Sequence, residues 1–487
     1  MTTSASPLEP VLDALARAGL LVSRPPALPS VERLTTDSRT AGPGAFFLAV
    51  PGTQADGHAF VPDAVARGAA LVLVERHVTE AVPEVVVRDA RRAAIVAARA
   101  WYNDPTSAMT LVGITGTNGK TTTTALVRHL LNRQGDAGSI GTLGAFDGQG
   151  AEVPSTAGSL TTPGPVDLQA TFAALSARGV TRVAIEASSH SLAQGRLDGL
   201  VFGAGVFTNL TRDHLDYHVT MAAYLAAKLR LLDLMAPGGV VAVNRDDRVW
   251  DVIRAGPGRV TFGLHPDADV RGEDLLLAAQ GTHFRIAGRY GRCQIDLPLP
   301  GDFNVANALA AAACALGLGL RLTEVAERLA SAPQVPGRME RLATRPCVVL
   351  RDYAHTPDAL ERALSTLRPL TSGRLIVVFG CGGDRDRGKR PLMGRLAADH
   401  ADLAIVTSDN PRTEDPERII DDVMAGTSGG TVERIADRRE AIARALEIGQ
   451  EGDTVLLAGK GHETYQVIGT ARLPFDEGAI VRGMLGP

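Results

Sequence analysis

The chain has 487 residues, 45% of them hydrophobic and 21% charged, which is typical of globular proteins and argues against a disordered, collagen-like or coiled-coil chain. At roughly 100–200 residues per domain, this length predicts about three domains. Its 50 basic and 54 acidic residues give a net charge of −4, which argues against a dedicated nucleic-acid-binding protein, because such proteins usually carry a basic surplus.

The sequence also argues against a membrane-inserted or secreted protein. The longest run of apolar residues and glycine, 308–320, is too short to span a bilayer, and the first residues lack the basic and apolar regions of a signal peptide. The four cysteines, Cys293, Cys314, Cys347 and Cys381, form no CxxC pair, so we expect free thiols rather than disulfides or a zinc site. We therefore predict a cytoplasmic protein.

The first predicted elements, within residues 1–107, are short helices and strands. We expect a helix over 11–20 and strands near 45–50, 70–74 and 84–87. The sequence Trp-Tyr-Asn-Asp-Pro at 101–105 predicts the end of a helix followed by a turn.

From residue 109 the pattern changes to alternating strands and helices. Strands predicted at 109–115, 180–186, 201–208 and 239–244 alternate with helices at 121–134, 166–178 and 221–235. A β insertion over 260–300 and a helix over 303–317 precede a second series, with strands at 347–352, 374–379, 402–407 and 453–458. This order predicts an α/β protein with parallel strands, and we place three domains at 1–107, 108–333 and 334–487.

The most specific motif is a glycine-rich turn between a strand and a helix. Residues 115–122 read TGTNGKTT, in which glycines let backbone N–H groups surround a phosphate and Lys120 reaches the outer phosphates. The hydroxyl of Thr121 can ligate Mg²⁺. Because Ile114 stands where the strict GxxxxGK[ST] pattern has glycine, this is a variant P-loop with Gly116 at the turn.

Acidic and imidazole side chains follow the next strands of this series. The strand at 180–186 ends in Glu186, and the strand at 201–208 leads to the segment HLDYH, which begins at His214. The carboxyl ends of parallel strands share one edge of a sheet, so we expect both residues near the P-loop. There they could hold a second Mg²⁺ beside nucleotide phosphates.

Lysine is rare in this chain. Only four of the 50 basic residues are lysines, namely Lys120, Lys228, Lys389 and Lys460. A lysine amine can lose its proton and be modified, which arginine cannot in practice. Lys228 lies in the apolar helical segment YLAAKL, where a snorkelling surface lysine is the alternative interpretation. The scarcity of lysine favours a chemically used amine.

The last domain carries three charged loops, each after an apolar strand. They are 380–390, 409–414 and 459–463, with the sequences GCGGDRDRGKR, DNPRTE and GKGHE. Their convergence at one sheet edge predicts a polyanionic or zwitterionic substrate.

In this order the motifs resemble the Mur ligase family, the ATP-dependent amino-acid-adding enzymes of peptidoglycan synthesis. The resemblance covers essentially the whole chain and rests on TGTNGKTT, EASSH, NLTRDHLDYH, YLAAK, GDFNVANALAA, GRME, DYAHTPDAL, GCGGDRDRGKRPLMG, DNPRTE and AGKGHETYQ. The segments TDSR at 36–39 and GTQADG at 52–57 resemble uridine-nucleotide-binding segments of the family. Two departures are Thr53, where histidine is common, and Arg351, in place of an apolar residue.

The resemblance implies a fold and a reaction. It implies an amino-terminal uridine-nucleotide-binding α/β domain, a central P-loop ATPase domain with a mostly parallel sheet, and a carboxyl-terminal Rossmann-like α/β domain. ATP would phosphorylate the D-glutamyl carboxylate of UDP-N-acetylmuramoyl-L-alanyl-D-glutamate, and the amine of meso-diaminopimelate would displace the phosphate. Such an enzyme serves cell-wall biogenesis, cell shape and cell division, and we expect a monomer.

The resemblance also implies a role for each matching residue. The catalytic residues would be Lys120, Lys228, His214 and Arg338. ATP would contact Gly116, Thr117, Asn118, Gly119, Lys120, Thr121, Thr122, Asn304, Arg338 and Asp352. Two Mg²⁺ ions would use Thr121, Glu186, His214 and Lys228, the last as an N6-carboxylysine carbamate formed with CO₂. The UDP-muramoyl dipeptide would contact Thr36, Ser38, Thr53, Gln54, Ala55, Thr161, Thr162, Ser188, Gln194 and Arg196. The diamino acid would contact Arg390, Asp409, Asn410, Pro411, Arg412, Gly459 and Glu463.

Three alternatives stay open at this stage. The same ligase could add L-ornithine or L-lysine, because the DNPR segment alone does not exclude them. A folylpolyglutamate synthase-like ligase would leave the segments at 36–39, 52–57 and 409–412 unexplained. A P-loop switch or motor is a third class, but Arg245 replaces the lysine of the guanine-reading NKxD motif, and a motor on nucleic acid should be more basic.

Overall fold

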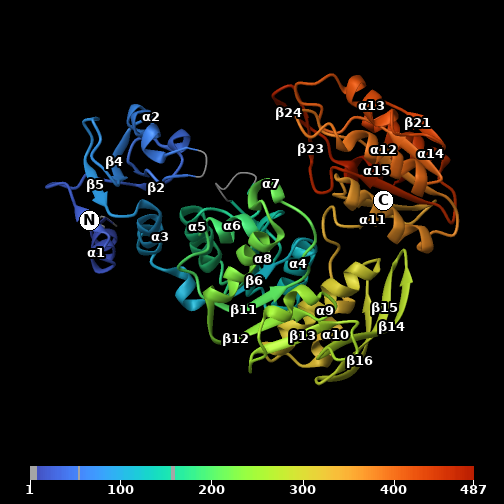
Figure 1. Ribbon diagram of the computed structural model, residues 1–487, viewed down its shortest axis with the longest axis horizontal. Helices are drawn as coiled ribbons and strands as arrows, with labels where there is room; N and C mark the ends of the chain where they lie inside the picture. The colour runs from blue at the N-terminus through green and yellow to red at the C-terminus, as the bar shows by residue number, and fades with distance from the viewer. Residues whose placement is uncertain (1–7, 53–54, 155–159, 487) are drawn as a thin grey trace. The chain divides into compact units, whose positions relative to one another are not determined.

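The computed structural model describes residues 8–52, 55–154 and 160–486 (Figure 1). The chain divides into two compact units. Unit 1 comprises Met1–Lys120, Leu131–Ala242 and Val252–Arg259, and unit 2 comprises Thr121–Leu130, Val243–Asp251 and Val260–Pro487.

Unit 1 begins with a five-stranded sheet covered on both faces. Its strand order is β1-β5-β4-β3-β2, from β1 (Leu21–Ser23), β2 (Arg33–Thr35), β3 (Ala45–Leu48), β4 (Ala69–Val74) and β5 (Glu84–Val87). Only the β1–β5 pair is antiparallel among these. The accompanying helices are α1 (Leu8–Arg17), α2 (Val61–Ala66) and α3 (Ala90–Trp101). Phe46 packs with α1 and α3 while Phe47 packs with α2, which explains the continuous apolar runs of these strands.

Unit 1 also contains the parallel strands that carry the P-loop. Four parallel strands lie side by side in the order β11 (Phe202–Phe207), β6 (Thr110–Thr115), β10 (Arg182–Glu186) and β7 (Ala137–Gly141). Two antiparallel strands, β8 (Gly144–Phe146) and β9 (Glu152–Val153), continue the sheet beyond β7. The helices that follow these strands are α5 (Pro165–Ala177), α6 (Ser189–Ala193), α7 (Leu215–His218) and α8 (Met221–Leu229) in unit 1, and α4 (Lys120–Leu131), most of which belongs to unit 2. Glu186 pairs in register with Ile114, so β6 and β10 end side by side.

Five strands follow along the chain. The last four form the predicted β insertion, in which the first pair is parallel and the other two pairs are antiparallel. The strands are β12 (Met235–Asn244), β13 (Arg259–Gly263), β14 (Val270–Ala278), β15 (Gly281–Gly288) and β16 (Gly291–Leu297). They belong to an eleven-stranded order, β16-β15-β14-β13-β12-β11-β6-β10-β7-β8-β9. The helices α9 (Asp302–Gly317) and α10 (Leu322–Ala330) follow. Most of α9 is buried, as expected of its alanine-rich sequence.

The last part of unit 2 is a second α/β sheet. Its order is β17-β18-β22-β19-β20-β21, from β17 (Glu340–Ala343), β18 (Val348–Asp352), β19 (Leu375–Phe379), β20 (Leu403–Val406), β21 (Val432–Arg434) and β22 (Thr454–Ala458). All neighbours are parallel except β17 and β18. The helices are α11 (Pro357–Leu367), α12 (Lys389–His400), α13 (Pro416–Met424), α14 (Arg438–Ile448) and α15 (Glu477–Leu485). A separate hairpin joins β23 (Tyr465–Ile468) to β24 (Ala471–Pro474).

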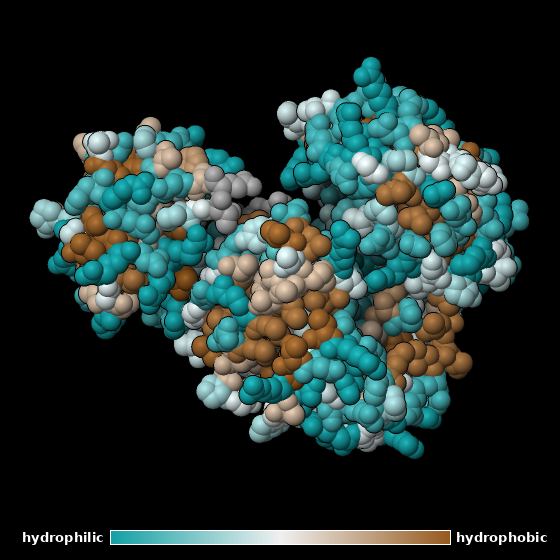
Figure 2. Space-filling view, viewed as in Figure 1, coloured by the Kyte–Doolittle hydropathy of each residue, from teal (hydrophilic) through white to brown (hydrophobic). Residues whose placement is uncertain are grey.

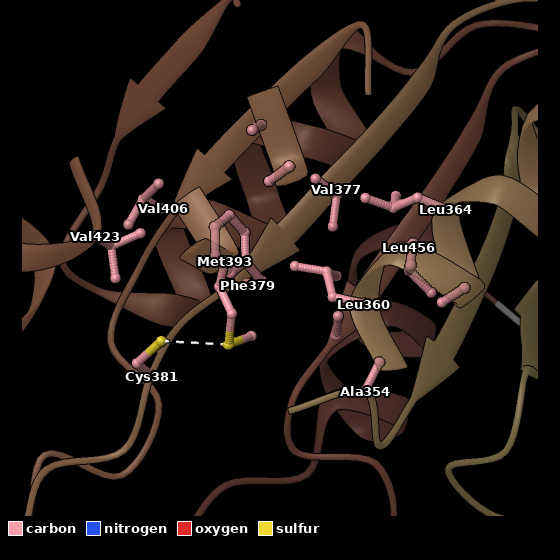
Figure 3. Close-up of a cluster of buried hydrophobic side chains, with 14 of the residues drawn as sticks. Ala354, Leu360, Leu364, Val377, Phe379, Cys381, Met393, Val406, Val423 and Leu456 are labelled. Carbon is pink, nitrogen blue, oxygen red and sulfur yellow. Dashed lines mark hydrogen bonds between the residues drawn. The ribbon is translucent and has the colours of Figure 1, made fainter. Parts of the chain in front are cut away.

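One core of this sheet is shown in Figure 3. Phe379 and Val377 from β19 pack with Leu360 and Leu364 of α11 in a cluster of buried side chains. Cys381 is buried just beyond β19, and its thiol donates to Met393 Sδ at 3.7 Å. This packing anchors the loop after β19, one of the three charged loops.

The structure confirms the predicted fold class and the order of its main elements. The predicted helix at 221–235 is shorter, because α8 ends at Leu229 and a 3₁₀ helix continues over Arg230–Leu234. The four cysteines are free thiols, as predicted. The domain boundaries at 107 and 333 stay predictions.

The surface is mixed in character. Figure 2 shows hydrophobic residues in separate groups among hydrophilic ones on the viewed face. Within the part of the chain that the structure describes, no helix has both the length and the apolar character needed to cross a membrane.

Candidate active site

The P-loop is a tight turn between β6 and α4. Gly116 has a φ of +149°, and a Cβ atom there would lie 1.8 Å from Thr208 Oγ1, so only glycine fits. Gly119 has a φ of +83° and immediately precedes α4. Lys120 Nζ donates to the carbonyl oxygens of Gly116 at 3.0 Å and Thr117 at 2.7 Å. The lysine therefore lies over the loop that the sequence predicts to surround a phosphate.

The end of β11 holds this loop in place. The backbone carbonyl of Asn209 accepts a hydrogen bond from the Thr117 N–H at 2.7 Å, and its side-chain oxygen accepts one from the Asn118 N–H at 2.9 Å. Thr208 Oγ1 donates to the Asn118 carbonyl at 2.7 Å. Neighbouring strand ends thus fix the backbone of the predicted phosphate site, and the next two predicted ATP contacts, Thr121 and Thr122, are buried at the start of α4.

Lys228 is buried against the P-loop. It is 1% exposed, and its Nζ donates to the Gly116 carbonyl at 2.7 Å. The same Nζ lies 4.3 Å from the centre of the Tyr224 ring, one helical turn earlier on α8. Burial, and then the charge of Lys120, hold the pKa of Lys228 well below its usual range. The geometry therefore favours a neutral amine, the form that can react with CO₂.

Three imidazoles gather beside this lysine. The His190 ring lies 4.8 Å from His214 and 5.4 Å from His218, and His218 Nε2 is 3.0 Å from Ser189 Oγ. Burial lowers the pKa of all three, that of His190 to about 4, and neighbouring positive charge adds to the effect. For His214 that charge includes Lys120 and Lys228. The imidazoles are thus neutral at neutral pH, as a metal ligand must be.

Glu186 occupies the end of β10, as predicted. It is 1% exposed, and its carboxylate accepts hydrogen bonds from the Thr142 N–H at 2.8 Å and the Thr142 hydroxyl at 3.1 Å. A Cβ atom on Gly141 would lie 2.3 Å from Glu186 Oε1, so the glycine leaves room for the carboxylate. The described residues contain no group of three His, Cys, Asp or Glu side chains placed to hold a metal. The predicted magnesium ligands include only two residues of those types, and the set stays a prediction.

Several residues predicted to hold the UDP-muramoyl dipeptide meet next to β10. Thr162 donates from its hydroxyl to the Glu186 carbonyl at 2.7 Å, and Ser188 Oγ lies 3.2 Å away. Arg196 donates to the Thr162 carbonyl at 3.0 Å and to Gln194 Oε1 at 2.6 Å. Burial lowers the pKa of Arg196. These four residues form one polar cluster.

The remaining predicted contacts to this substrate are dispersed. Thr161 Oγ1 accepts a hydrogen bond from Thr142 at 3.2 Å. Thr36 is exposed, Ser38 is buried in a 3₁₀ helix after β2, and Ala55 is exposed. Thr53 and Gln54 lie outside the described residues.

In unit 2, Arg338 lies at the predicted nucleotide contacts. Its Nη2 donates to Thr121 Oγ1 at 3.4 Å, and its guanidinium lies 5.0 Å from the centre of the Tyr353 ring. Asp352 Oδ2 accepts from the Met339 N–H at 2.8 Å, and burial raises the pKa of this aspartate although Arg338 opposes the shift. Asn304, the other predicted ATP contact, is buried and donates to the Pro300 carbonyl at 2.8 Å.

Arg390 has protein carboxylates as partners. It is fully buried and donates to Glu414 at 2.8 and 3.0 Å and to Asp422 at 2.8 Å. Two hydrogen bonds from Arg390 lower the pKa of Glu414 to about 2. Arg390 thus fixes the base of the DNPRTE loop, a connection that the sequence did not reveal.

The other predicted diamino acid contacts form a polar cluster at the ends of β20 and β22. Asn410 Nδ2 donates to Glu463 Oε2 at 2.8 Å. Asp409 lies beside Gly459, where an added Cβ atom would be 3.6 Å from Asp409 Oδ2. The buried Pro411 precedes Arg412, which has a φ of +51°.

Arg412 is held from both sides. Its Nη1 donates to the Gly383 carbonyl at 2.7 Å, and its backbone N–H donates to the Val467 carbonyl of the hairpin at 3.0 Å. The Gly469 N–H donates in turn to the Arg412 carbonyl at 2.7 Å. The hairpin therefore fixes the backbone that presents this guanidinium.

Sequence reasoning missed several residues of these clusters. Tyr224 precedes Lys228 by one helical turn, and that spacing could have revealed it. Lys460 stands out in the sequence as a rare lysine in a charged loop, and its i,i+3 spacing to Glu463 could have indicated their ion pair. No local sequence pattern indicated a role for Glu414, because its partner Arg390 lies 24 positions away.

Comparisons with known proteins agree with the geometry. Three family models match the chain: "Mur ligase family, catalytic domain" over 30–104, "Mur ligase middle domain" over 114–315 and "Mur ligase, glutamate ligase domain" over 337–461. The chain is 45% identical over 474 residues, 95% of each chain, to the UDP-N-acetylmuramoyl-L-alanyl-D-glutamate–2,6-diaminopimelate ligase of Gloeobacter violaceus. It is 45% identical over 468 residues to the ligase of that name from Geobacillus kaustophilus, covering 93% of this chain and 94% of that protein. A solved structure of a ligase with this name matches with a TM-score of 0.66 and 36% identity, over 93% of this chain and 94% of the other.

Proposed function

Because the chain belongs to the Mur ligase family of ATP-dependent amide ligases, we propose that it joins meso-diaminopimelate to UDP-N-acetylmuramoyl-L-alanyl-D-glutamate in peptidoglycan synthesis. Relatives that match nearly the whole chain bear the name of this activity. The supporting structural observation is the polar cluster of Asp409, Asn410, Arg412 and Glu463. It offers a guanidinium and carboxylates, the groups that recognise an amino acid.

The proposed reaction has two steps. The D-glutamyl carboxylate attacks the γ-phosphorus of ATP, forming an acyl phosphate and releasing ADP. The neutral amine of the diamino acid then attacks the acyl carbon, phosphate leaves with the C–O bonding pair, and the nitrogen loses a proton as the amide forms. Each step develops negative charge on phosphate oxygens, which cations stabilise.

The P-loop supplies the first of these cations. Lys120 Nζ lies on the Gly116 and Thr117 carbonyls, and it can turn from these neutral acceptors to the phosphates of ATP. Backbone N–H groups of the loop and the start of α4 favour the same anion. Arg338, which bonds Thr121 at the start of α4, is the second proposed cation.

Lys228 is proposed to act as a carbamate. Carboxylation replaces a buried cation with an anion, and it requires the neutral amine that the lowered pKa of Lys228 provides. The carbamate, the Thr121 hydroxyl and the Glu186 carboxylate would offer the oxygen ligands that Mg²⁺ prefers, and the neutral His214 would add a nitrogen ligand. Mg²⁺ commonly keeps part of its coordination for phosphates and water. The two proposed Mg²⁺ ions would neutralise charge on ATP and on the developing acyl phosphate.

The remaining assignments are also part of the proposal. Thr162, Ser188, Gln194 and Arg196 are proposed to hold the UDP-muramoyl dipeptide because they already form one polar cluster. We propose a cytoplasmic monomer with the domain boundaries predicted from the sequence.

The test is ATP-dependent phosphate release by the purified protein with each substrate omitted in turn. We expect release only when UDP-N-acetylmuramoyl-L-alanyl-D-glutamate and meso-diaminopimelate are both present, with the amide product detected by mass spectrometry. Equal turnover with L-lysine or L-ornithine would refute the proposed third substrate while keeping the ligase reaction. Nucleotide hydrolysis that needs neither substrate would contradict the whole proposal.

A further inference from the structure

Lys460 is a fully buried cation beside the proposed diamino acid contacts and is not itself one of them. It lies directly after Gly459 at the carboxyl end of β22 and is 0% exposed. A buried lysine is uncommon unless it is paired. Its partners therefore indicate its purpose.

Those partners are residues of the proposed site. Lys460 Nζ donates to Asn410 Oδ1 at 3.1 Å and to Glu463 Oε2 at 3.2 Å. It also lies 3.6 Å from Asp409 Oδ1. One ammonium group thus joins the DNPR loop after β20 to the GKGHE loop after β22.

The ammonium also fixes which way Asn410 points. A lysine can only donate hydrogen bonds, so the oxygen of the Asn410 amide must face Lys460. The same oxygen accepts the Val467 N–H at 2.9 Å, and the amide nitrogen donates to Glu463 Oε2 at 2.8 Å. The position of Glu463 is therefore set from two directions, by Lys460 and by Asn410.

The charge of the cluster depends on Lys460. Asp409 and Glu463 contribute two negative charges, and Lys460 and Arg412 contribute two positive ones, so the four side chains sum to zero. The far end of meso-diaminopimelate is an α-amino acid group, with one carboxylate and one ammonium, and is also neutral. The far end of L-lysine carries an ammonium alone. Without the Lys460 charge the cluster becomes negative, which favours the ligand with the extra positive charge.

We propose that Lys460 is a positioning residue that sets the preference of this site for a diamino acid with a second carboxylate. It acts through Glu463, Asn410 and Asp409. This inference rests on the proposed function, because it assumes that these residues receive the diamino acid. The competing interpretation is a buried ion pair that serves stability alone.

The test compares Lys460→Gln with Lys460→Arg and with a control variant at the amino ends of the strands of the same sheet. The control is Arg374→Gln, because Arg374 pairs at 2.7 Å with the buried Asp453 just before β22 begins. For each protein we would measure the melting temperature, the KM of all three substrates, and the ratio of kcat/KM for meso-diaminopimelate to that for L-lysine.

Lys460→Gln should raise the KM for meso-diaminopimelate and lower the preference ratio by about tenfold or more, the effect expected from one charged hydrogen bond. The KM values for ATP and the UDP-linked substrate should stay within about threefold, because the hydrogen bonds of Lys460 go to Asn410 and Glu463 of the proposed diamino acid site. Lys460→Arg keeps the charge and should keep the ratio within about threefold even if its turnover falls. Arg374→Gln should lower the melting temperature and leave the ratio unchanged.

An equal loss with both amino acids, or a similar change of ratio in Arg374→Gln, would overturn the role of Lys460. If Lys460→Gln does not fold, Lys460→Arg decides. A preference ratio that Lys460→Arg retains would support the charge argument, and a tenfold fall in this ratio would contradict it. The proposed function fails separately, if the wild type does not use meso-diaminopimelate.

Discussion

Lys228 Nζ donates a hydrogen bond to the backbone carbonyl of Gly116 at 2.7 Å, which joins the buried lysine of α8 to the first glycine of the P-loop. An amine at this position is within reach of the proposed phosphate site. The same contact shows that the lysine is not a snorkelling surface residue, the alternative that its apolar helix had left open.

The first prediction concerns the chemistry of Lys228. Lys228→Arg keeps a positive charge but cannot form a carbamate, so we expect kcat to fall by about 10²-fold or more, nearly as far as in Lys228→Ala. Added bicarbonate should rescue neither variant, whereas a short carboxylate such as acetate should partly rescue Lys228→Ala. Full activity of Lys228→Arg would mean that only a cation is needed.

Lys120→Ala should lose turnover without losing the fold. The side chain contacts loop carbonyls, so its removal leaves α4 and the strands intact, and we expect kcat to fall by about 10²–10³-fold. Arg245→Ala is the matched control, because Arg245 pairs with Asp251, outside the P-loop, and should leave turnover unchanged. Normal turnover of Lys120→Ala at an unchanged melting temperature would contradict the P-loop assignment.

Tyr224 links the P-loop to Lys228 and should matter through both its hydroxyl and its ring. The hydroxyl lies 3.2 Å from Thr117 Oγ1, and burial raises the pKa of Tyr224 to about 12, so it keeps its proton at neutral pH. Tyr224→Phe removes one hydrogen bond and should raise the KM for ATP by about threefold to tenfold. Tyr224→Leu also removes the ring beside Lys228 and should lower kcat further; equal kinetics of the two variants would show that the ring is dispensable.

The sequence predicted the sheets of this protein because their strands are apolar on both faces. The strands β19 and β22 are wholly buried, and their alternation with amphipathic helices made a parallel sheet the natural interpretation. The hairpin over 465–474 was missed for the opposite reason. Its strands have four residues each, β23 is only half-buried and β24 is exposed and ends in Pro474, so no buried apolar run marks the hairpin in the sequence.

The candidate site was predictable where residues are close in sequence and unpredictable where they are not. The P-loop is one continuous turn, and its glycines and lysine form a motif that is recognisable in the sequence. The pairing of Arg390 with Glu414 and Asp422 depends on how α12 and α13 pack, which no local pattern encodes. The resemblance implies that Arg390 contacts the diamino acid, which stays a prediction, whereas the structure shows the two protein carboxylates that bind this arginine.

Glu414 provides a prediction about pH. Hydrogen bonds from Arg390 lower its pKa from an ordinary 4.5 to about 2, so between these values the unfolded chain binds a proton that the folded chain does not. The stabilisation is complete above the unfolded pKa and is lost as pH falls through this window toward 2. Urea unfolding midpoints should therefore fall less steeply between pH 5 and pH 3 in Glu414→Gln than in the wild type, with the variant less stable at pH 7. Parallel curves would show that the Arg390–Glu414 pair does not control acid stability.

The last prediction concerns Arg412, the guanidinium proposed to hold the second carboxylate of meso-diaminopimelate. The hairpin fixes its backbone and the Gly383 carbonyl accepts from its Nη1, so the group is positioned before any ligand binds. With L-lysine bound, the guanidinium meets no carboxylate, and each charged hydrogen bond lost costs about 1.5–3 kcal/mol. The wild type should therefore prefer meso-diaminopimelate by up to roughly 10⁴-fold, and Arg412→Ala should lose most of that preference. Arg387→Ala is a suitable control, because this exposed arginine pairs with Glu414, which is not among the proposed contacts of the diamino acid, and should leave the preference intact. Competition among meso-diaminopimelate, L-lysine and L-ornithine measures the preference directly. If Arg412→Ala still selects meso-diaminopimelate, another group reads the second carboxylate, and the ligase reaction itself remains.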